Sequence, residues 1–307
     1  MPASRFRYAR LATERANSRS RALDRMTPGG IAGLMNREDR RAVAAVGRVR
    51  PEIAAAVKLI VAALRRGGRL FFVGAGTSGR LGVLEAAECP PTFGTPPRLV
   101  QAIIAGGRGS VFRSREGAED DQAAARRAVR GRVRRGDVVV GVSASGVTPF
   151  VRAALAAARR QGAATVLVAC NAEGARGARS SANIRIVPLT GAEVLAGSTR
   201  LKAGTATKLV LNTLTTAAMT GLGRVYGNRM IDLQPRSAKL YERALRLVAD
   251  LGGVSRGRAR AALKASRGRV RVAIVMAKSG GTAVEASRAL AAAGGSLRMA
   301  LQKPRRK

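Results

Sequence analysis

Short apolar segments alternate with helical periodicity in the middle of this 307-residue chain. Five runs of strand length lie at Arg69–Val73, Arg98–Ile104, Asp137–Val142, Ala164–Ala169 and Ile184–Pro188. Helices are expected between most of them, at Leu81–Glu88, Asp120–Arg130 and Pro149–Gln161. This alternation predicts an α/β fold with a doubly wound, five-stranded parallel sheet sandwiched by helices. Ligands in such a sheet bind at the carboxyl ends of the strands, where the strand order reverses.

The segments on either side of this core are predicted to be helical. Helical periodicity runs over residues 38–66, where Pro51 should kink or divide it, and a long helix is expected over Leu201–Thr220. Beyond Ala238 the pattern predicts a small all-helical domain with helices at Lys239–Leu251, Ser255–Ala265, Val270–Ala277 and Gly281–Ala293. We therefore expect an N-terminal arm with helices (1–66), a central domain (67–238), a helical C-terminal module (239–302) and a disordered basic tail (303–307).

Composition narrows the class of protein. The chain has no histidine, which excludes a His-based catalytic triad and most zinc sites. Its two cysteines, Cys89 and Cys170, form no metal pattern and fit a reducing compartment without structural disulfides. No apolar run reaches the roughly 18 residues that a membrane span needs, and the N-terminus lacks the apolar centre of a secretory signal. We expect a soluble, cytoplasmic protein with no membrane partner.

The formal charge of +38 makes nucleic-acid binding a rival hypothesis. The arginines are spread along the chain, however, and three Tyr, six Phe and no Trp offer few rings on which bases could stack. Solvated, arginine-rich helix faces are the simpler interpretation of the charge. Nonspecific association with RNA or DNA at low salt is still expected.

The most informative segment, FVGAGTSGRLGVLEAAECPPTFG at 72–94, joins a strand, a glycine-rich loop and a helix. Gly76 lets the backbone approach a ligand, Thr77 and Ser78 supply hydroxyls, and a helix starting near Ser78 supplies N–H groups. This combination suits a phosphate ester. The spacing matches neither dinucleotide-binding nor nucleotide-binding loops, while a plain strand-to-helix turn remains the alternative.

Two further segments could complete an anion site. A second strand end presents Ser143, Ser145, Gly146 and Thr148 before Pro149, so that two such turns could hold one phosphate from two sides. Ser198 precedes the long helix of residues 201–220, and Lys202 lies in its first turn. Helix capping alone would also favour hydroxyl residues at these positions.

Candidate proton-transfer groups are two glutamates. Pro90 and Pro91 should end the first helix near Glu88, where the negative end of the helix dipole favours the protonated carboxyl. Glu119 lies in the acidic run EGAEDD at 116–121, and it could pair with Glu88 as base and acid. The alternatives are an ion pair of Glu88 with an arginine and acid enrichment in the first turn of the next helix. For Glu85, a solvated or ion-paired helix residue is the favoured interpretation.

Taken together, these motifs resemble those of the N-acetylmuramic acid 6-phosphate etherases, which belong to the sugar-isomerase (SIS) domain group. The matching segments are TERANSRSRALDRMT at 13–27, GAGTSGRLGVLEAAECPPTFG at 74–94, EGAEDD at 116–121, SASGVTP at 143–149, GSTRLKAGTATKLVLN at 197–212 and GRVYGNRMIDLQP at 223–235. Val147 departs from the family, many members of which carry arginine there. The related glucokinase regulatory proteins share the fold but are much longer, with two such domains.

This resemblance implies cleavage of the D-lactyl ether of N-acetylmuramic acid 6-phosphate during cell-wall recycling, without a cofactor and in a homodimer. It assigns Glu88 to protonating the departing lactate and activating water, and Glu119 to removing the C2 proton. Ser78, Ser145 and Thr148 map to phosphate and sugar contacts, and Ser198 and Lys202 fall in a motif near the site. The alternative from another class is a noncatalytic phosphosugar-sensing module that also binds nucleic acid through its arginines.

Overall fold

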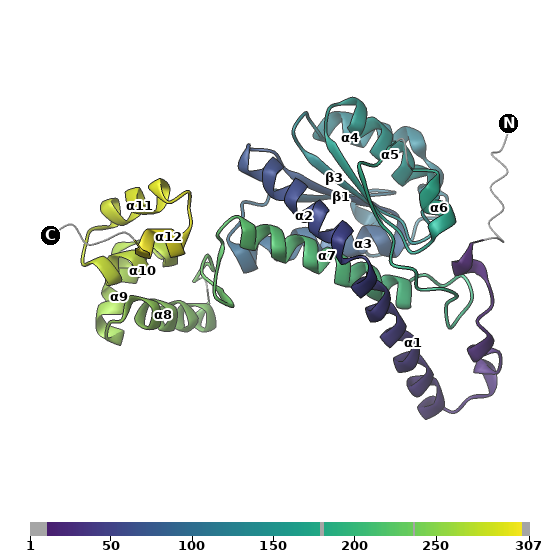
Figure 1. Cartoon of the computed structure of the whole chain (residues 1–307), viewed down its shortest axis with the longest axis horizontal. Coiled ribbons are helices and arrows are strands. Elements are labelled where there is room, and N and C mark those ends of the chain that lie inside the picture. Colours follow the sequence, from purple (N-terminus) through teal and green to yellow (C-terminus); the bar gives the residue numbers. More distant parts are fainter. Residues whose placement is uncertain (1–10, 179–180, 236, 303–307) are drawn as a thin grey trace. The chain divides into compact units, whose positions relative to one another are not determined.

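The computed structural model describes residues 11–178, 181–235 and 237–302 (Figure 1). The first ten residues of the expected N-terminal arm and the basic tail at 303–307 lie outside this range. The chain forms two compact units, the first made of residues 1–86 and 98–215 and the second of residues 87–97 and 216–307. None of the described helices is long and apolar enough to cross a membrane.

The first unit is built on a five-stranded sheet in which every neighbouring pair of strands is parallel. Its strands are β1 (Leu70–Gly74), β2 (Val100–Ile104), β3 (Val138–Val142), β4 (Ala164–Val168) and β5 (Ile184–Ile186). They lie in the order β2-β1-β3-β4-β5. The predicted strands and the doubly wound parallel sheet are therefore confirmed.

The two faces of the sheet are covered because successive side chains of a strand point to opposite sides. Phe71 belongs to the cluster that β1 forms with α4 (Gln122–Arg132) and α5 (Pro149–Arg160). Phe72 faces the other way, against α3 (Gly76–Phe93), where a Cβ on Gly82 would lie 2.7 Å from the Cβ of Phe72. Helix α3 can therefore pack directly on the strand only because residue 82 lacks a side chain.

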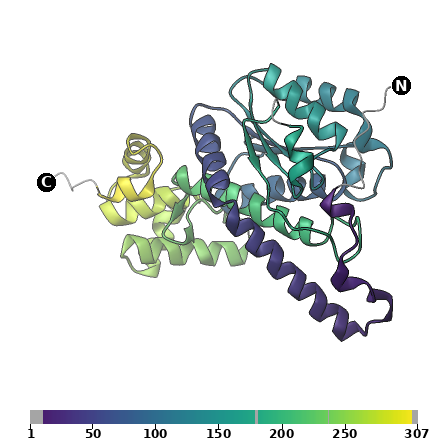
Figure 2. The same ribbon diagram turned by 45° about the vertical axis from the view of Figure 1, so that its right-hand side comes forward.

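The N-terminal helices are α1 (Pro28–Arg48) and α2 (Arg50–Arg65), which divide at Val49, just before Pro51, as predicted. Helix α1 begins ten residues earlier than the periodicity indicated, and Figure 2 shows it as a long element that extends past the sheet. Thr27 caps it by accepting a hydrogen bond from the N–H of Gly30. Three glycines in its first two turns masked the helical pattern, although Thr27 followed by Pro28 is a helix-start signal.

Helix α3 differs from its prediction at both ends. It starts at Gly76 instead of near Ser78, and it continues through Pro90 and Pro91 to Phe93. Pro90 and Pro91 cannot donate to the carbonyls of Ala86 and Ala87, but because they lie in the final turn only these two intrahelical hydrogen bonds are lost before the helix ends. The helix stops at Gly94, whose φ of 61° is left-handed and whose N–H donates to the Pro90 carbonyl at 2.9 Å.

The remaining elements of the first unit are short except for α7 (Lys202–Gly221), which matches the expected long helix and continues past the boundary at residue 215. Helix α6 (Ala172–Arg176) follows β4 and was not predicted. Single turns of 3₁₀ helix occur at η2 (Ala12–Glu14), η3 (Ser18–Ser20), η4 (Leu23–Arg25), η5 (Arg108–Val111) and η6 (Ala118–Asp120).

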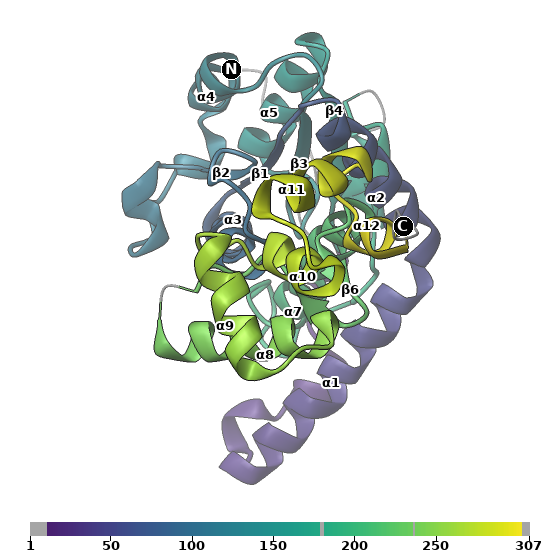
Figure 3. The same cartoon turned by 90° about the vertical axis from the view of Figure 1, so that its left-hand side faces the viewer.

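The second unit is mainly helical, as predicted (Figure 3). It contains α8 (Ala238–Gly252), α9 (Arg256–Ala265), α10 (Val270–Ser279), α11 (Ala283–Ala292) and α12 (Leu297–Gln302), which share one apolar core. A small hairpin of β6 (Val225–Tyr226) and β7 (Arg229–Met230) precedes them. Gly227 and Asn228 form the turn between the two strands, and this dipeptide is a sequence signal for a β-hairpin.

Leu167→Ala should destabilise the protein by about 2–5 kcal/mol, because Leu167 is fully buried in β4 and its removal leaves a cavity in the core. The free energy of unfolding in urea would measure this. Leu195→Ala is the matched control, since Leu195 is 55% exposed, and it should change stability little. Equal losses in the two variants would contradict the packing of β4.

Candidate active site

The strand order reverses between β1 and β3, which are neighbours in the sheet. The chain continues from β1 to β2 on one side of this pair and from β3 to β4 on the other. Gly74 at the end of β1 is in register with Val142 at the end of β3. The loops that follow the two strands therefore start side by side at the carboxyl edge of the sheet. This is the place where a doubly wound sheet binds ligands, and both predicted phosphate loops lie there.

The loop after β1 is held tightly against the sheet. Gly76 has a left-handed φ of 52°, and a Cβ on Gly79 would lie 2.7 Å from the Gly74 carbonyl oxygen. These contacts place Thr77 and Ser78 in the first turn of α3, where the backbone N–H groups lack intrahelical acceptors. The first turn thus offers hydroxyls and N–H donors to an anion.

The loop after β3 forms a network of hydroxyl groups. The Ser143 hydroxyl lies 2.8 Å from that of Thr148 and 3.4 Å from that of Ser145, and it accepts a hydrogen bond of 3.0 Å from the Gly146 N–H. The Ser145 hydroxyl accepts from the Val147 N–H at 3.3 Å. The loop is therefore ordered by its own side chains before any ligand binds.

Gly146 is required at its position in this loop. Its φ is 75°, and an added Cβ would lie 2.9 Å from backbone atoms of both Gly174 and Ala175 on α6. The side chain of Val147, at the position where the family often has arginine, is buried. It consequently packs into the protein interior.

The start of α7 adjoins both loops. A Cβ on Gly204 would lie 3.9 Å from the Thr77 methyl group, and Ala203 of α7 belongs to the same apolar cluster as Ala144 of the second loop. Ser198, in the segment before α7, is half-buried. The N-termini of α3, α5 and α7 therefore converge near one place at the sheet edge.

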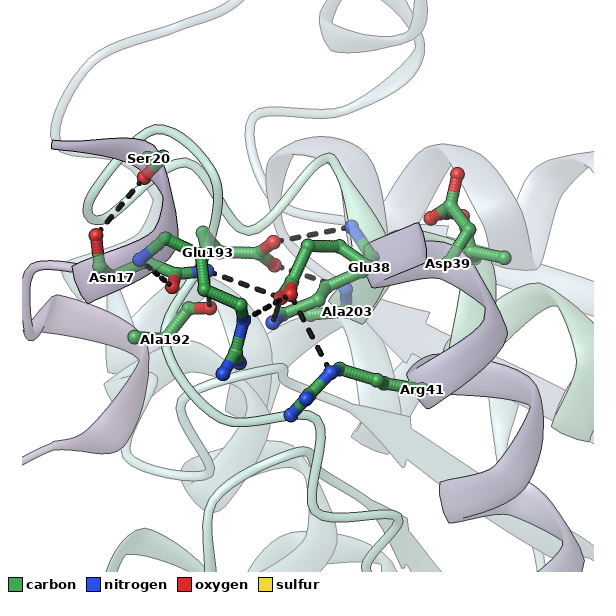
Figure 4. Close-up of polar contacts among 11 residues, drawn as sticks. Asn17, Ser20, Glu38, Asp39, Arg41, Ala192, Glu193 and Ala203 are labelled. Carbon is green, nitrogen blue, oxygen red and sulfur yellow. Dashed lines mark hydrogen bonds and ion pairs between the residues drawn. The ribbon is translucent and has the colours of Figure 1, made fainter. Parts of the chain in front are cut away.

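Lys202, predicted to bind the ligand, lies in a buried ion pair. Its side chain is 2% exposed, and its ammonium donates a short hydrogen bond to the carboxylate of Glu38 on α1, which is 1% exposed. Arg19 and Asn17 donate to the same carboxylate at 2.7 and 3.1 Å (Figure 4). The network ties the N-terminal segment to α1 and α7.

The charge state of Glu38 follows from these partners. Burial alone would raise the pKa of its carboxyl, but the hydrogen bonds and charges of Lys202 and Arg19 outweigh burial and lower the pKa from 4.5 to about 2. Glu38 is therefore ionised at neutral pH, and it neutralises the Lys202 ammonium.

A second buried carboxylate, Glu193, caps α7. Its two oxygens accept hydrogen bonds from the N–H groups of Lys202 at 3.2 Å and Ala203 at 2.9 Å, and Figure 4 shows it beside Ala203. Burial raises the pKa of Glu193, against the opposing effect of these two N–H groups. This cap fixes the orientation of the first turn of α7.

Glu88 and Glu119, the predicted proton-transfer residues, are exposed, and neither has a hydrogen bond or ion pair to the residues that the structure describes. Glu119 lies on η6, after Gly117 in a left-handed conformation. Glu88 lies inside α3 and not at its end, so the argument from the helix C-terminus is wrong. The predicted alternative of an arginine partner for Glu88 is not seen among the described residues.

Two other acids have structural roles. Glu85 is buried, and its carboxylate pairs with Lys208 and accepts a hydrogen bond from the Thr215 hydroxyl at 2.8 Å. It is thus ion-paired, one of its two predicted states. Asp121 caps α4 by accepting from the Ala124 N–H at 2.8 Å. Helix capping therefore accounts for one member of the acidic run.

The two cysteines are buried, and neither is in a disulfide. Burial raises the pKa of the Cys170 thiol to about 12, which makes it a poor nucleophile. Among the described residues, no cluster of Cys, Asp and Glu could hold a metal ion.

Comparison with known proteins reveals close relatives. The chain is 48% identical over 292 residues to an N-acetylmuramic acid 6-phosphate etherase of Synechocystis sp., with 95% of each chain covered. It is 52% identical over 296 residues to the protein of that name from Gloeobacter violaceus, with 96% of each covered. A family model described as the glucokinase regulatory protein N-terminal SIS domain matches residues 52–159.

A solved structure shares the fold. The phosphoheptose isomerase of Francisella tularensis matches with a TM-score of 0.50 at 17% identity, over 65% of this chain and 98% of that one. Together with the family model, this match confirms the predicted SIS-type sheet.

Gly146→Ala should weaken phosphosugar binding at least tenfold, because the new methyl group forces the second loop away from α6. Calorimetric titration with N-acetylglucosamine 6-phosphate would measure the change. Gly280→Ala is the matched control, since Gly280 also has a φ of 75° but an added Cβ would meet nothing within 4 Å. If both variants bind like the wild type, the loop does not contact the ligand.

Glu38 should stabilise the protein in a pH-dependent way. Because its folded pKa of about 2 lies below its ordinary value of 4.5, its contribution is complete above about pH 4.5 and falls as the pH drops toward 2. The difference in unfolding free energy between wild type and Glu38→Gln should shrink over this window by about 3 kcal/mol. Urea unfolding at pH values between 6 and 2.5 tests this.

The control for this experiment is Glu242→Gln, which removes an exposed ion pair with Arg256. Exposed pairs contribute about 0–1 kcal/mol, so the difference from wild type should stay small at every pH. A constant difference for Glu38→Gln across the window would disprove the role assigned to Glu38.

Proposed function

Since this chain belongs to the N-acetylmuramic acid 6-phosphate etherase family, we propose that it cleaves the D-lactyl ether of N-acetylmuramic acid 6-phosphate, as a carbon-oxygen lyase of cell-wall sugar recycling. The products are N-acetylglucosamine 6-phosphate and D-lactate. Sequence identities of 48% and 52% over almost the whole chain support this proposal. The structural observation on which it rests is the pair of hydroxyl-rich loops that start side by side at the carboxyl edge of β1 and β3.

The loops would bind the phosphate of the substrate. Ser78 and Thr77 offer hydroxyls and N–H groups from the first turn of α3, while Ser143, Ser145 and Thr148 offer hydroxyls from the second loop. Gly76 and Gly146 keep the backbone close to the ligand. Ser198 would add a contact, and Lys202 would act indirectly by fixing the start of α7, because its ammonium is already paired with Glu38.

Glu88 and Glu119, which have no partner among the described residues, would move the protons. In the open-chain sugar, the C1 aldehyde acidifies the C2 proton, which the Glu119 carboxylate removes. The electron pair forms a C2=C3 double bond as the C3–O bond breaks, and Glu88 protonates the departing D-lactate oxygen. Water, activated by Glu88, then adds to C3 while a proton returns to C2. The reaction consumes one water and needs no cofactor.

We further propose a homodimer in the cytoplasm. Glu88 lies about three helical turns beyond Ser78 on α3, and a second subunit could supply contacts that span this separation. Two cysteines without a disulfide between them agree with a reducing compartment. Nonspecific nucleic-acid association at low salt would follow from the charge of +38.

The noncatalytic phosphosugar sensor is the less favoured alternative, because the relatives named above are enzymes by name. Tight binding of the substrate without D-lactate release would nevertheless point to it.

Glu88→Gln and Glu119→Gln should each lower D-lactate release by at least 10²-fold, but they should differ in deuterium exchange. Glu88→Gln keeps the C2 base and should still exchange the C2 proton of N-acetylglucosamine 6-phosphate in D₂O. Glu119→Gln should lose this exchange. Enzymatic D-lactate assay and NMR measure the two effects.

Glu52→Gln, at an exposed position on α2, is the control and should keep both activities. Near-normal lactate release from Glu88→Gln would contradict its role. Exchange that persists in Glu119→Gln would assign the C2 base to another residue.

A further inference from the structure

The helical unit contains a cavity of about 980 Å³. It opens between α9, α10 and α11 and the segment of residues 232–235 that precedes α8. All of its lining residues belong to the second unit, so it is separate from the loops at the sheet edge. The proposed etherase reaction leaves this cavity without a role.

Basic side chains dominate the polar lining of the cavity. Asp232 is its one carboxylate, and its basic residues are Arg224, Arg260, Lys264, Arg267, Arg269 and Arg271. The high net charge of the chain does not by itself require that basic residues outnumber acidic ones in the lining of a cavity. The cavity of about 610 Å³ beside the acidic run is lined by Arg115 and Arg127 together with Glu116 and Asp121, so its charges balance.

Two of the six cations are fixed in place around Asp232. Arg271 lies 2.5 Å from one carboxylate oxygen of Asp232, and Arg224 lies 3.2 Å from the other. Each arginine also donates to a backbone carbonyl, Arg271 to Gly295 and Arg224 to Phe93. The negative charge in the cavity is thus already compensated, and the inner guanidinium groups are held rigidly.

Three further cations, all with exposed side chains, have no anionic partner among the described residues. Arg260 and Lys264 are four residues apart on α9, so they share one face of the helix and repel each other. Neither they nor Arg267 has an ion pair or side-chain hydrogen bond with any described residue. Positive charge that is gathered in a concave site without a partner is suited to an anionic ligand.

The backbone at Arg267 supports a ligand site. With a φ of 55°, it is the one non-glycine residue in the described part of the chain with a left-handed conformation. Helices usually end on glycine in this conformation, and here glycine follows as residue 268. Placing arginine there costs backbone strain, which persists most often where a side chain serves a function.

The rest of the lining is apolar. Leu233, Leu263, Val270 and Leu290 are buried, and the half-buried Tyr241 adds an aromatic ring. A purely inorganic ion would leave this surface uncovered. The volume also exceeds what one phosphate requires and lies in the range of small-molecule sites.

We propose that this cavity is a second ligand site, which binds a small organic phosphate with its anionic group on Arg260, Lys264 and Arg267 and its remaining part against the apolar wall. Guanidinium groups bind carboxylate and phosphate oxygens alike in pairs, and three cations in one place match the higher negative charge of a phosphate. A sugar phosphate and a nucleotide share this chemistry.

The test uses the full-length protein and calorimetric titration with inorganic pyrophosphate at 150 mM salt, in which any binding at the sheet-edge loops is the same for the wild type and both double variants. Arg260→Gln/Lys264→Gln should weaken pyrophosphate binding at least tenfold and leave D-lactate release unchanged. The control, Arg258→Gln/Lys278→Gln, removes the same charge from exposed positions outside the cavity and should bind like the wild type. Equal affinity in both double variants, or equal loss in both, would overturn the proposal.

Arg267→Gly tests whether Arg267 contributes to pyrophosphate binding without lowering the stability of the fold. Glycine relieves the left-handed strain, so the Tm should rise or stay the same while pyrophosphate binding weakens. Unchanged affinity in this variant would remove Arg267 from the site. Titration of the wild type with glucosamine 6-phosphate and with AMP then distinguishes the two sources of phosphate, and failure of both ligands to bind would refute an organic phosphate as the occupant.

Discussion

The buried ion pair between Glu38 and Lys202 is the interaction on which the candidate site most depends. The two side chains come from α1 and α7, which are 164 positions apart in the sequence, and both are almost fully removed from water. Neither charge could remain there without the other, since removing one partner of a buried pair costs about 3–5 kcal/mol. The same carboxylate also binds Asn17 and Arg19, so one residue joins three parts of the first unit.

Close backbone packing supplies the second constraint. Gly79 and Gly146 each lie where a methyl group would contact backbone atoms within 3 Å, which brings the two hydroxyl-rich loops to fixed positions at the ends of β1 and β3. The internal hydrogen bonds of Ser143 then orient the second loop. A site that is ordered in this way loses little entropy when it binds a ligand.

The sheet and most helices could be predicted because their signals are local. Short, valine-rich apolar runs such as Val138–Val142 favour buried strands, and Pro149 marks the start of α5. The end of α3 could not be predicted in the same way, because proline is allowed in a last turn that Gly94 closes. The partner of Lys202 could not be predicted either, because a pairing across 164 positions leaves no periodic trace. The cationic cavity could not be predicted either, because its lining comes from four helices and from the segment of residues 232–235, which only the folded unit brings together.

The cap that Glu193 provides has a consequence for turnover. By accepting the N–H groups of Lys202 and Ala203, it neutralises the positive end of α7, just as Glu38 neutralises the Lys202 ammonium. Helix α7 therefore shapes the candidate site without adding attraction for an anion, and in the proposed function the attraction for the phosphate would come from the first turns of α3 and α5. Substrate and product carry the same phosphate, so a stronger grip would hold both equally and slow the departure of the product. With the positive end of α7 neutralised, the proposed site would bind the phosphate and still release it.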